Sequence, residues 1–347
     1  MAEFFSAYGL FLAQAITVVV AVLGVVGGVL IISMRSRPEG GEHIEIKHLN
    51  RKFEEMENVL QAAMLPKAAL KKRTKEQKKR RKTEEKQGET AEAEKSKRVF
   101  VLDFHGDIRA SAVSALREEI SAVLTVARPQ DEVLVRIESS GGLVHGYGLA
   151  ASQLVRVKEK GIPLTVAVDK AAASGGYMMA CVADQIIAAP FAVLGSIGVL
   201  AQLPNFHRLL EKNDIDFEQF MAGEHKRTVT VFGKNTEEGK EKFRQELEDL
   251  HGLFKDFVRE HRAQLDIEKV STGEHWFGKQ ALTLGLVDGL RTSDDYLMCA
   301  RETAELYEVH YFSEKKPLLA RLANLTEGRG VRGDLGHPVL SQPTLQR

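Results

Sequence analysis

The chain has 347 residues, enough for one sizeable folded core with appended segments. Its 48 Lys and Arg balance its 48 Asp and Glu, so no net charge commits the chain to a polyanion such as a nucleic acid. Cys181 and Cys299 are the only cysteines, and neither stands in a metal-ligand or redox spacing. The composition therefore excludes a disulfide-stapled scaffold.

Residues 1–36 begin with a long uncharged stretch. No charged side chain occurs from Phe4 to Met34, where Val, Leu, Ile, Ala and Gly dominate. About 20 apolar residues of helix suffice to cross a bilayer. A cleaved signal peptide is the alternative, but Glu3 stands where its basic start would be. We therefore expect residues 1–36 to form a retained transmembrane anchor.

Residues 37–65 have the pattern of an amphipathic, heptad-like helix. The pattern covers fewer than three heptads, so a self-associating seam and a single helix lying on another surface remain equally good interpretations. Its apolar residues recur at alternating spacings of three and four and are Ile46, Leu49, Phe53, Met56, Leu60 and Ala63.

Residues 66–98 are predicted to be a basic linker. From Lys67 to Lys82 there are ten Lys and Arg against one acidic residue, Glu76, and large apolar side chains are almost absent up to Arg98. A basic run beside a membrane is attracted to anionic lipid, which makes the lipid bilayer the expected partner. No aromatic residues interleave with the charges, so nucleic acid is not an expected partner.

Hydrophobic runs return at Val99 and alternate with helix-like segments. This alternation predicts βαβ units and a mostly parallel sheet in an α/β domain spanning residues 99–312, followed by a tail at 313–347. The uncharged run 185–206 is broken by Pro190 and several glycines, which favours a buried strand and turn over a second membrane span. The predicted strands are Val99–Phe104, Val133–Ile137, Leu164–Val168 and Ile186–Ala189, and the predicted helices are Ser111–Val126 and Gly146–Glu159.

Two Gly-rich turns follow predicted strands, Glu138-Ser-Ser-Gly-Gly142 and Ala171-Ala-Ala-Ser-Gly-Gly-Tyr177. In the second, Ser174 precedes a helix-like run, where its hydroxyl would be exposed beside amides able to receive an oxyanion. Taken alone, the turn is better explained by a helix N-cap serine. A nucleophilic serine also needs a base, and the scattered histidines form no recognisable motif. A buried, neutral lysine is the alternative, with Lys170 as one candidate.

Five segments in order, ESSGGLVHGYG, AAASGGYMMACVAD, APFAVLGSIGV, AGEHKRTVTVFG and TGEHWFGKQALTLGLVDGL, resemble the bacterial signal peptide peptidase A family, most closely its short members. The resemblance covers roughly Val99 to Leu290 and implies a crotonase/Clp-protease-like fold of repeated ββα units. One departure is Ser140, where the family usually has proline before the Gly-Gly pair. The roles that the resemblance implies are Ser174 as nucleophile and Lys226 as base, with Gly141, Gly142 and Gly175 as the oxyanion hole and Gly195, Ser196, Ile197 and Gly198 as the substrate groove.

The resemblance implies a serine-type endopeptidase without metal or other cofactor. Its substrates would be hydrophobic, unfolded or membrane-released peptides, such as spent signal peptides. In family members with one catalytic domain the dyad is shared between neighbouring protomers, so a homo-oligomer is expected. The expected location is the bacterial inner membrane, with a cytoplasmic catalytic domain favoured by the basic flank and a periplasmic one by the family. The alternatives are a non-catalytic membrane scaffold and an acyl-CoA enzyme of the same fold.

Overall fold

The structure is a computed structural model that describes residues 42–66, 97–223 and 225–313, together with 13–22 and the single residues 9, 24 and 79. It divides into two units, of which Ile44–Phe312 carries the sheet, and Met1–His43 with Ser313–Arg347 forms the other. In the second of these, residues 13–22 are helical and expose their valines.

Among the described residues, no helix is both long enough and apolar enough to cross a bilayer. The transmembrane helix predicted for residues 1–36 is therefore not found, and most of that range lies outside the described residues. The predicted linker at 66–98 and the predicted tail at 313–347 also lie almost wholly outside them.

In the described part of the chain, the alternating apolar runs form a ten-stranded sheet with the order β1-β10-β2-β3-β4-β6-β9, from which β5, β7 and β8 branch. The neighbours β2, β3, β4 and β6 pair in parallel, which confirms the four predicted strands and the α/β class. The uncharged run 185–206 supplies β6 and β7, as a buried strand and turn. The strands are β1 (His43–His48), β2 (Lys97–Gly106), β3 (Glu132–Ser139), β4 (Leu164–Val168), β5 (Ala171–Ala173), β6 (Gln185–Ala188), β7 (Val193–Gly195), β8 (His275–Phe277), β9 (Gly289–Leu290) and β10 (Ala304–Phe312).

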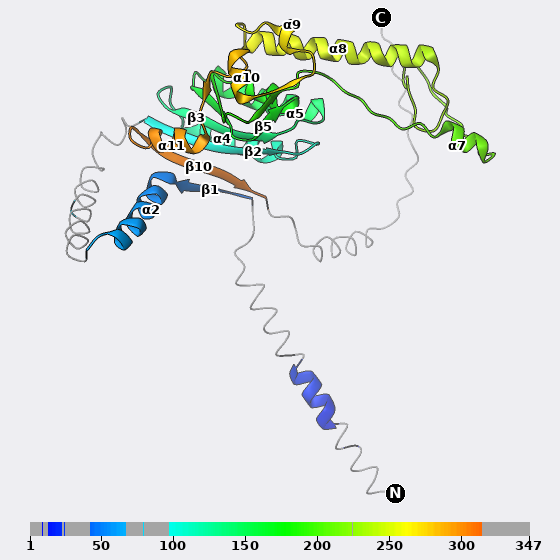
Figure 1. Ribbon diagram of the computed structural model, residues 1–347. Coiled ribbons are helices and arrows are strands. Elements are labelled where there is room, and N and C mark those ends of the chain that lie inside the picture. The colour runs from blue at the N-terminus through cyan, green and yellow to red at the C-terminus, as the bar shows by residue number, and fades with distance from the viewer. Residues whose placement is uncertain are drawn as a thin grey trace, which may run out of the picture. The chain divides into compact units, whose positions relative to one another are not determined.

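Helices cover both faces of the sheet, with α4 and α5 on one face and α2 and α11 on the other (Figure 1). Strand β2 shows why its sequence is apolar without a break: Phe100, Leu102 and Phe104 enter the core under α4 and α5, while Val99 and Val101 enter the core under α2 and α11. The helices are α2 (Leu49–Met64), α4 (Val113–Val126), α5 (Val144–Glu159), α6 (Gly175–Ala180), α7 (His207–Lys212), α8 (Glu237–His261), α9 (Ile267–Val270), α10 (Gly278–Thr283) and α11 (Ser293–Ala300).

The amphipathic helix predicted over 37–65 starts later than expected. Residues His43–His48 form β1, where Ile44 and Ile46 alternate with polar residues in the two-residue period of a strand. The helix begins at Leu49, and its first apolar residues, Leu49 and Phe53, pack on the core under α2 and α11. This part of the predicted seam therefore packs against the core of its own chain.

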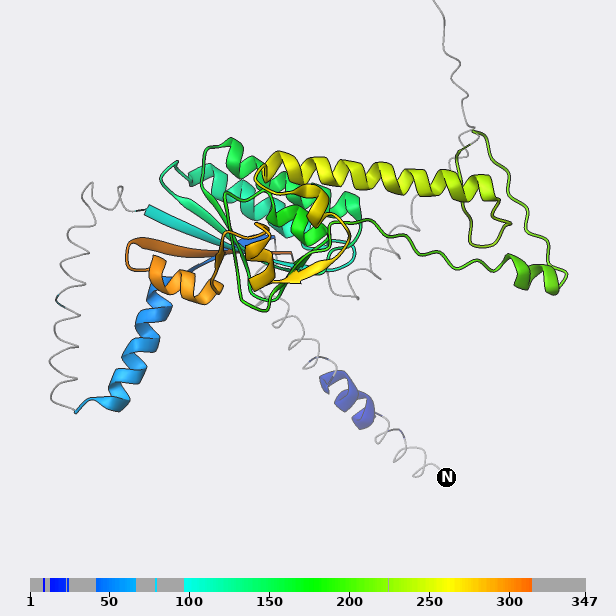
Figure 2. The same ribbon diagram turned by 45° about the horizontal axis from the view of Figure 1, so that its top comes forward.

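Residues 199–236, here called the arm, extend away from the sheet after β7. The arm ends at the amino-terminal end of α8. Figures 1 and 2 both show α7, which belongs to the arm, beyond that end of α8 and away from the strands. None of the described residues of the arm is buried. Phe232 contacts Phe206 and Phe217, yet apolar side chains such as Phe220, 89% exposed, face solvent.

Candidate active site

Ser174 occupies a sharp turn between β5 and α6. Its backbone has φ 51° and ψ −118°, a left-handed conformation that favours glycine. The Ser174 amide donates to the Gly195 carbonyl at 2.8 Å, and its carbonyl accepts from the Met178 amide at 2.9 Å. Non-glycine residues in such conformations cost about 1–3 kcal/mol and cluster at functional sites. The strained turn therefore marks Ser174 as a candidate nucleophile.

The first Gly-rich turn lies directly against Ser174. A Cβ placed on Gly141 would stand 2.7 Å from the Ser174 Cβ and 2.8 Å from the Gly175 amide nitrogen. Gly141 has φ +90°, and a Cβ on Gly142 would meet the Ile108 carbonyl at 2.2 Å. Gly141 is thus required for its backbone conformation, and Gly142 is required because a side chain would not fit there. The turn therefore sets Gly141 against Ser174 and Gly175, with Gly142 next to it in the chain against Ile108.

A buried hydrogen-bond chain holds this turn, and sequence reasoning missed it. The Tyr147 hydroxyl donates to the Asp107 carbonyl at 2.8 Å and lies 2.5 Å from the Ser139 hydroxyl. The Ser139 hydroxyl in turn accepts from the Gly141 amide at 3.1 Å. Burial raises the pKa of Tyr147, with the Ser139 hydrogen bond opposing it, so the phenol stays a neutral donor. The available signal was the two-residue period of β3, which turns Ser139 inward with Ile137.

The predicted groove residues begin at Gly195, the last residue of β7. Strands β5 and β7 are parallel, and Ala173 lies opposite Gly195. The next residues, Ser174 and Ser196, therefore lie at the same end of the two strands. Ser196 also has φ 51°, and its amide donates to the Glu274 carbonyl at 2.6 Å. Gly195 packs on the ring of Trp276, whose atoms lie 2.7 Å from the position of a Cβ. Ile197 is buried and Gly198 lies against Gly273.

Lys226 does not meet Ser174 within one chain. It is exposed, and it lies two residues before Thr228, whose carbonyl fills the space beside Gly239 at the start of α8. At 1.5 Å per residue, about 22 Å of helix separates Gly239 from Phe254, where α8 joins the core that contains α6. The candidate base is thus at the far end of α8 from the candidate nucleophile.

The rival lysine has a different role. Lys170 precedes β5 in a bend, and its ammonium nitrogen lies 2.9 Å from each Glu138 carboxylate oxygen. Its side chain is 72% exposed. The Lys170 ammonium already donates to Glu138 and faces solvent, so its position does not suit the enclosed site of a general base.

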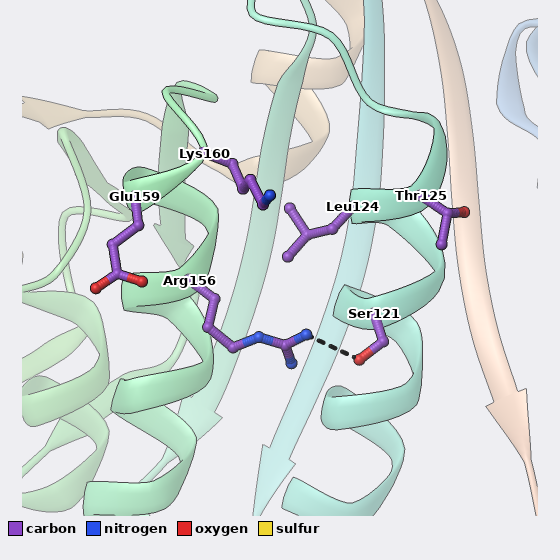
Figure 3. Close-up of a pocket in the computed structure, with 6 residues that line it drawn as sticks. All are labelled: Ser121, Leu124, Thr125, Arg156, Glu159 and Lys160. Atoms are coloured by element: carbon purple, nitrogen blue, oxygen red, sulfur yellow. Dashed lines mark hydrogen bonds between the residues drawn. The ribbon is translucent and has the colours of Figure 1, made fainter.

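A surface pocket of about 480 Å³ between α4 and α5 is lined by Ser121, Leu124, Thr125, Arg156, Glu159 and Lys160 (Figure 3). Its Arg156 guanidinium already donates to Ser121 and Gln153.

Asp103, Glu308 and His310 hold ligand-type atoms within 4.8 Å of one another and could in principle bind a metal ion. Arg136 donates to both carboxylates, at 2.5 and 2.6 Å to Asp103 and 2.5 Å to Glu308. One guanidinium therefore already binds both carboxylates and offsets one of their two negative charges, and we interpret the cluster as a structural ion-pair network.

Comparisons with known proteins identify the family of the chain. Residues 3–154 match the family description "Peptidase family S49 N-terminal", and residues 156–307 match "Peptidase family S49". The chain is 52% identical over 336 residues to "Probable protease SohB" of Haemophilus influenzae, covering 95% of each chain. It is 59% identical over 230 residues to the protein of the same name from Buchnera aphidicola subsp. Acyrthosiphon pisum, covering 66% of this chain and 68% of the relative.

The chain therefore belongs to peptidase family S49. Among solved structures, two mutants of a 1510-N membrane-bound stomatin-specific protease match at 12% and 11% identity with TM-scores of 0.40 and 0.42. The first match covers 59% of this chain and 84% of that one, and the second covers 67% and 99%. The second structure holds a substrate peptide.

Proposed function

We propose that the protein is a membrane-anchored serine endopeptidase that uses a Ser/Lys dyad of Ser174 and Lys226. The observation that carries the proposal is the strained backbone of Ser174, held by the Gly195 carbonyl beside the turn of Gly141 and Gly142. A neutral Lys226 amine takes the Ser174 proton, the alkoxide attacks a peptide carbonyl, and water later releases the acyl group.

The oxyanion is held by backbone amides in this proposal. The Gly175 amide is at the start of α6, where helical amides have no partner within the helix. Gly141 and Gly142 supply the opposite wall. The Gly141 amide already donates to Ser139, so it orients this wall, and the Gly142 amide is the donor offered to the oxyanion. Donors that are already oriented lose little free energy when negative charge develops, which is the source of their catalytic effect.

The dyad is assembled from two copies of the chain. The Lys226 loop belongs to the arm, which has exposed apolar residues and no buried residue among those described. Such a surface is typical of an interaction site, and a second copy is the partner that would also bring Lys226 to Ser174. Burial against that copy would disfavour the ammonium form, as a lysine base requires.

The groove and the amino-terminal segment suggest where the substrates come from. Ser196, beside Ser174, is placed to orient either Lys226 or the substrate. Exposed Ile108 and Leu143 border the Gly142 turn, which suits hydrophobic peptides. The uncharged stretch from Phe4 to Met34 supports a membrane anchor, and with it hydrophobic substrates released from the bilayer, such as spent signal peptides.

Hydrolysis of a fluorogenic hydrophobic peptide by the detergent-solubilised full chain tests the proposal, with Ser174→Ala and Lys226→Ala measured in parallel. Loss of turnover by at least about 10³-fold in both variants is expected. Full turnover in either variant contradicts the dyad. Turnover of an acyl-CoA thioester without peptide hydrolysis would favour acyl-CoA chemistry instead, and unchanged cellular function of both variants would favour a scaffold.

A further inference from the structure

Helices α6 and α8 both contact the same short turn, Gly285-Leu286-Val287-Asp288, here called the 285–288 turn. Helix α6 begins beside Ser174, and the loop before α8 carries Lys226. From α6, the Tyr177 hydroxyl donates to the Leu286 carbonyl at 2.9 Å. From the end of α8, the Arg262 guanidinium donates to the Gly285 carbonyl at 3.0 Å and to both Asp288 oxygens at 2.9 and 2.8 Å. The turn is therefore a common support for α6 and α8.

The ion pair that joins α8 to this turn is enclosed at its Arg262 end, while the Asp288 side chain is 30% exposed. The Arg262 side chain is 3% exposed, and Asp288 also accepts from the Ile186 amide of β6 at 2.7 Å. A two-point contact between guanidinium and carboxylate fixes orientation as well as distance, which a lysine ammonium does not. Arg262 thus sets the direction in which α8 leaves the core.

From this base α8 extends outward without further support. Phe254 and Val258 are buried in the core, whereas no described residue of the helix before His251 is buried. At the outer end, the Thr236 hydroxyl accepts from the Gly239 amide at 3.0 Å, and the Thr228 carbonyl lies 2.3 Å from the position of a Cβ on Gly239. The loop that carries Lys226 is thereby attached to the tip of the helix.

We propose that Arg262 and Asp288 are positioning residues. They fix the direction of α8, which acts as a rigid lever that places Lys226 beside Ser174 of a neighbouring copy. About 17 residues of helix, some 26 Å, separate Glu237 from Phe254. A tilt of about 5° at the base would move the tip by about 2 Å, and a misplacement of about 1 Å can cost about 100-fold in rate. The catalytic part of this inference rests on the proposed role of Lys226.

Distances between spin labels test the lever in the full chain. Glu118→Cys on α4 and Glu246→Cys on outer α8 carry the labels, because both sites are exposed. Cys299→Ser removes the exposed native thiol, while Cys181 is buried. Dilution with unlabelled chain leaves only pairs within one copy. Arg262→Lys is expected to shift or broaden the distance distribution by about 2 Å or more and to lower kcat about 100-fold at unchanged KM.

Arg259→Lys is the matched control, since Arg259 lies one turn earlier on α8 and its pairs with Asp256 and Glu268 are at the surface. It should change neither the distances nor kcat. If Arg262→Lys does not fold, Asp288→Asn replaces it, because the amide keeps an acceptor for Ile186. An unchanged distance distribution in the folded variant overturns the lever. A shifted distribution together with a fully active Lys226→Ala upholds the lever and refutes the dyad.

Discussion

The amide of Ser174 donates to the carbonyl of Gly195 at 2.8 Å, which places the candidate nucleophile at the edge of the predicted groove. The same parallel register sets Ser174 beside Ser196, and both serines have φ 51°. Two strained serines at neighbouring strand ends are costly unless the surrounding hydrogen bonds hold them. The strands thus fix the reacting hydroxyl and its neighbour together, before any substrate binds.

Substitutions of Ser174 should separate strain from chemistry. Both Ser174→Ala and Ser174→Gly remove the hydroxyl and should abolish peptide hydrolysis. Alanine keeps the unfavourable φ, whereas glycine tolerates it, so Ser174→Gly should be more stable than Ser174→Ala by about 1 kcal/mol. Denaturant unfolding of the two variants measures this difference. Equal stabilities would show that the turn is not strained.

Gly141→Ala should damage both stability and activity. The new Cβ would stand 2.7 Å from the Ser174 Cβ at a backbone φ of +90°, so we expect a loss of about 1–3 kcal/mol and of most turnover. The matched control is Gly148→Ala in α5, where nothing lies within 4 Å of the added Cβ. That control should be neutral or stabilised by up to about 1 kcal/mol. Thermal unfolding and the peptide assay compare the pair, and an active Gly141→Ala variant would remove this turn from the site.

A conservative change distinguishes the two lysines. An arginine cannot give up its proton at physiological pH, so Lys226→Arg should lose at least about 10³-fold in kcat while it keeps the positive charge. Lys170→Arg retains the exposed pair with Glu138 and should keep nearly full activity. The reverse pattern would make Lys170 the base.

Glu119 should make stability depend on pH. Its side chain is 4% exposed, and its Oε2 atom finds no hydrogen-bond partner among the described residues. Burial raises the pKa of Glu119, and the Tyr311 amide and His310 offset this only in part. The folded state therefore holds this proton more tightly than the unfolded state, so stability from this group falls as pH rises from about 4.3 through the raised pKa.

Glu119→Gln removes that titration while keeping an acceptor for the Tyr311 amide. The variant should be more stable than the parent at pH 8, and its advantage should shrink as the pH is lowered towards 4. Denaturant unfolding across this pH range measures it. An advantage that does not vary with pH would show that Glu119 is not a titrating buried acid.

The sequence predicted the α/β class and the four central strands because each strand is buried on both faces and therefore reads as an uninterrupted apolar run. Strand β1 was missed, since its Ile46 also fits a helical spacing when read together with Leu49 and Phe53. In the site, the Gly-rich turns were visible because Gly141 needs glycine for its φ, and Gly142 and Gly175 leave no room for a Cβ. The support from Tyr147 and Arg262 was invisible, because it depends on residues brought together from distant segments.

Mixing two inactive variants tests the central claim of a dyad shared between copies. Ser174→Ala supplies an intact Lys226, and Lys226→Ala supplies an intact Ser174. If neighbouring copies complete each site, subunit exchange at equal amounts should restore about a quarter of parental peptidase activity. If the mixture stays as inactive as its components after confirmed exchange, the dyad is not shared and the proposed assembly of the active site is wrong.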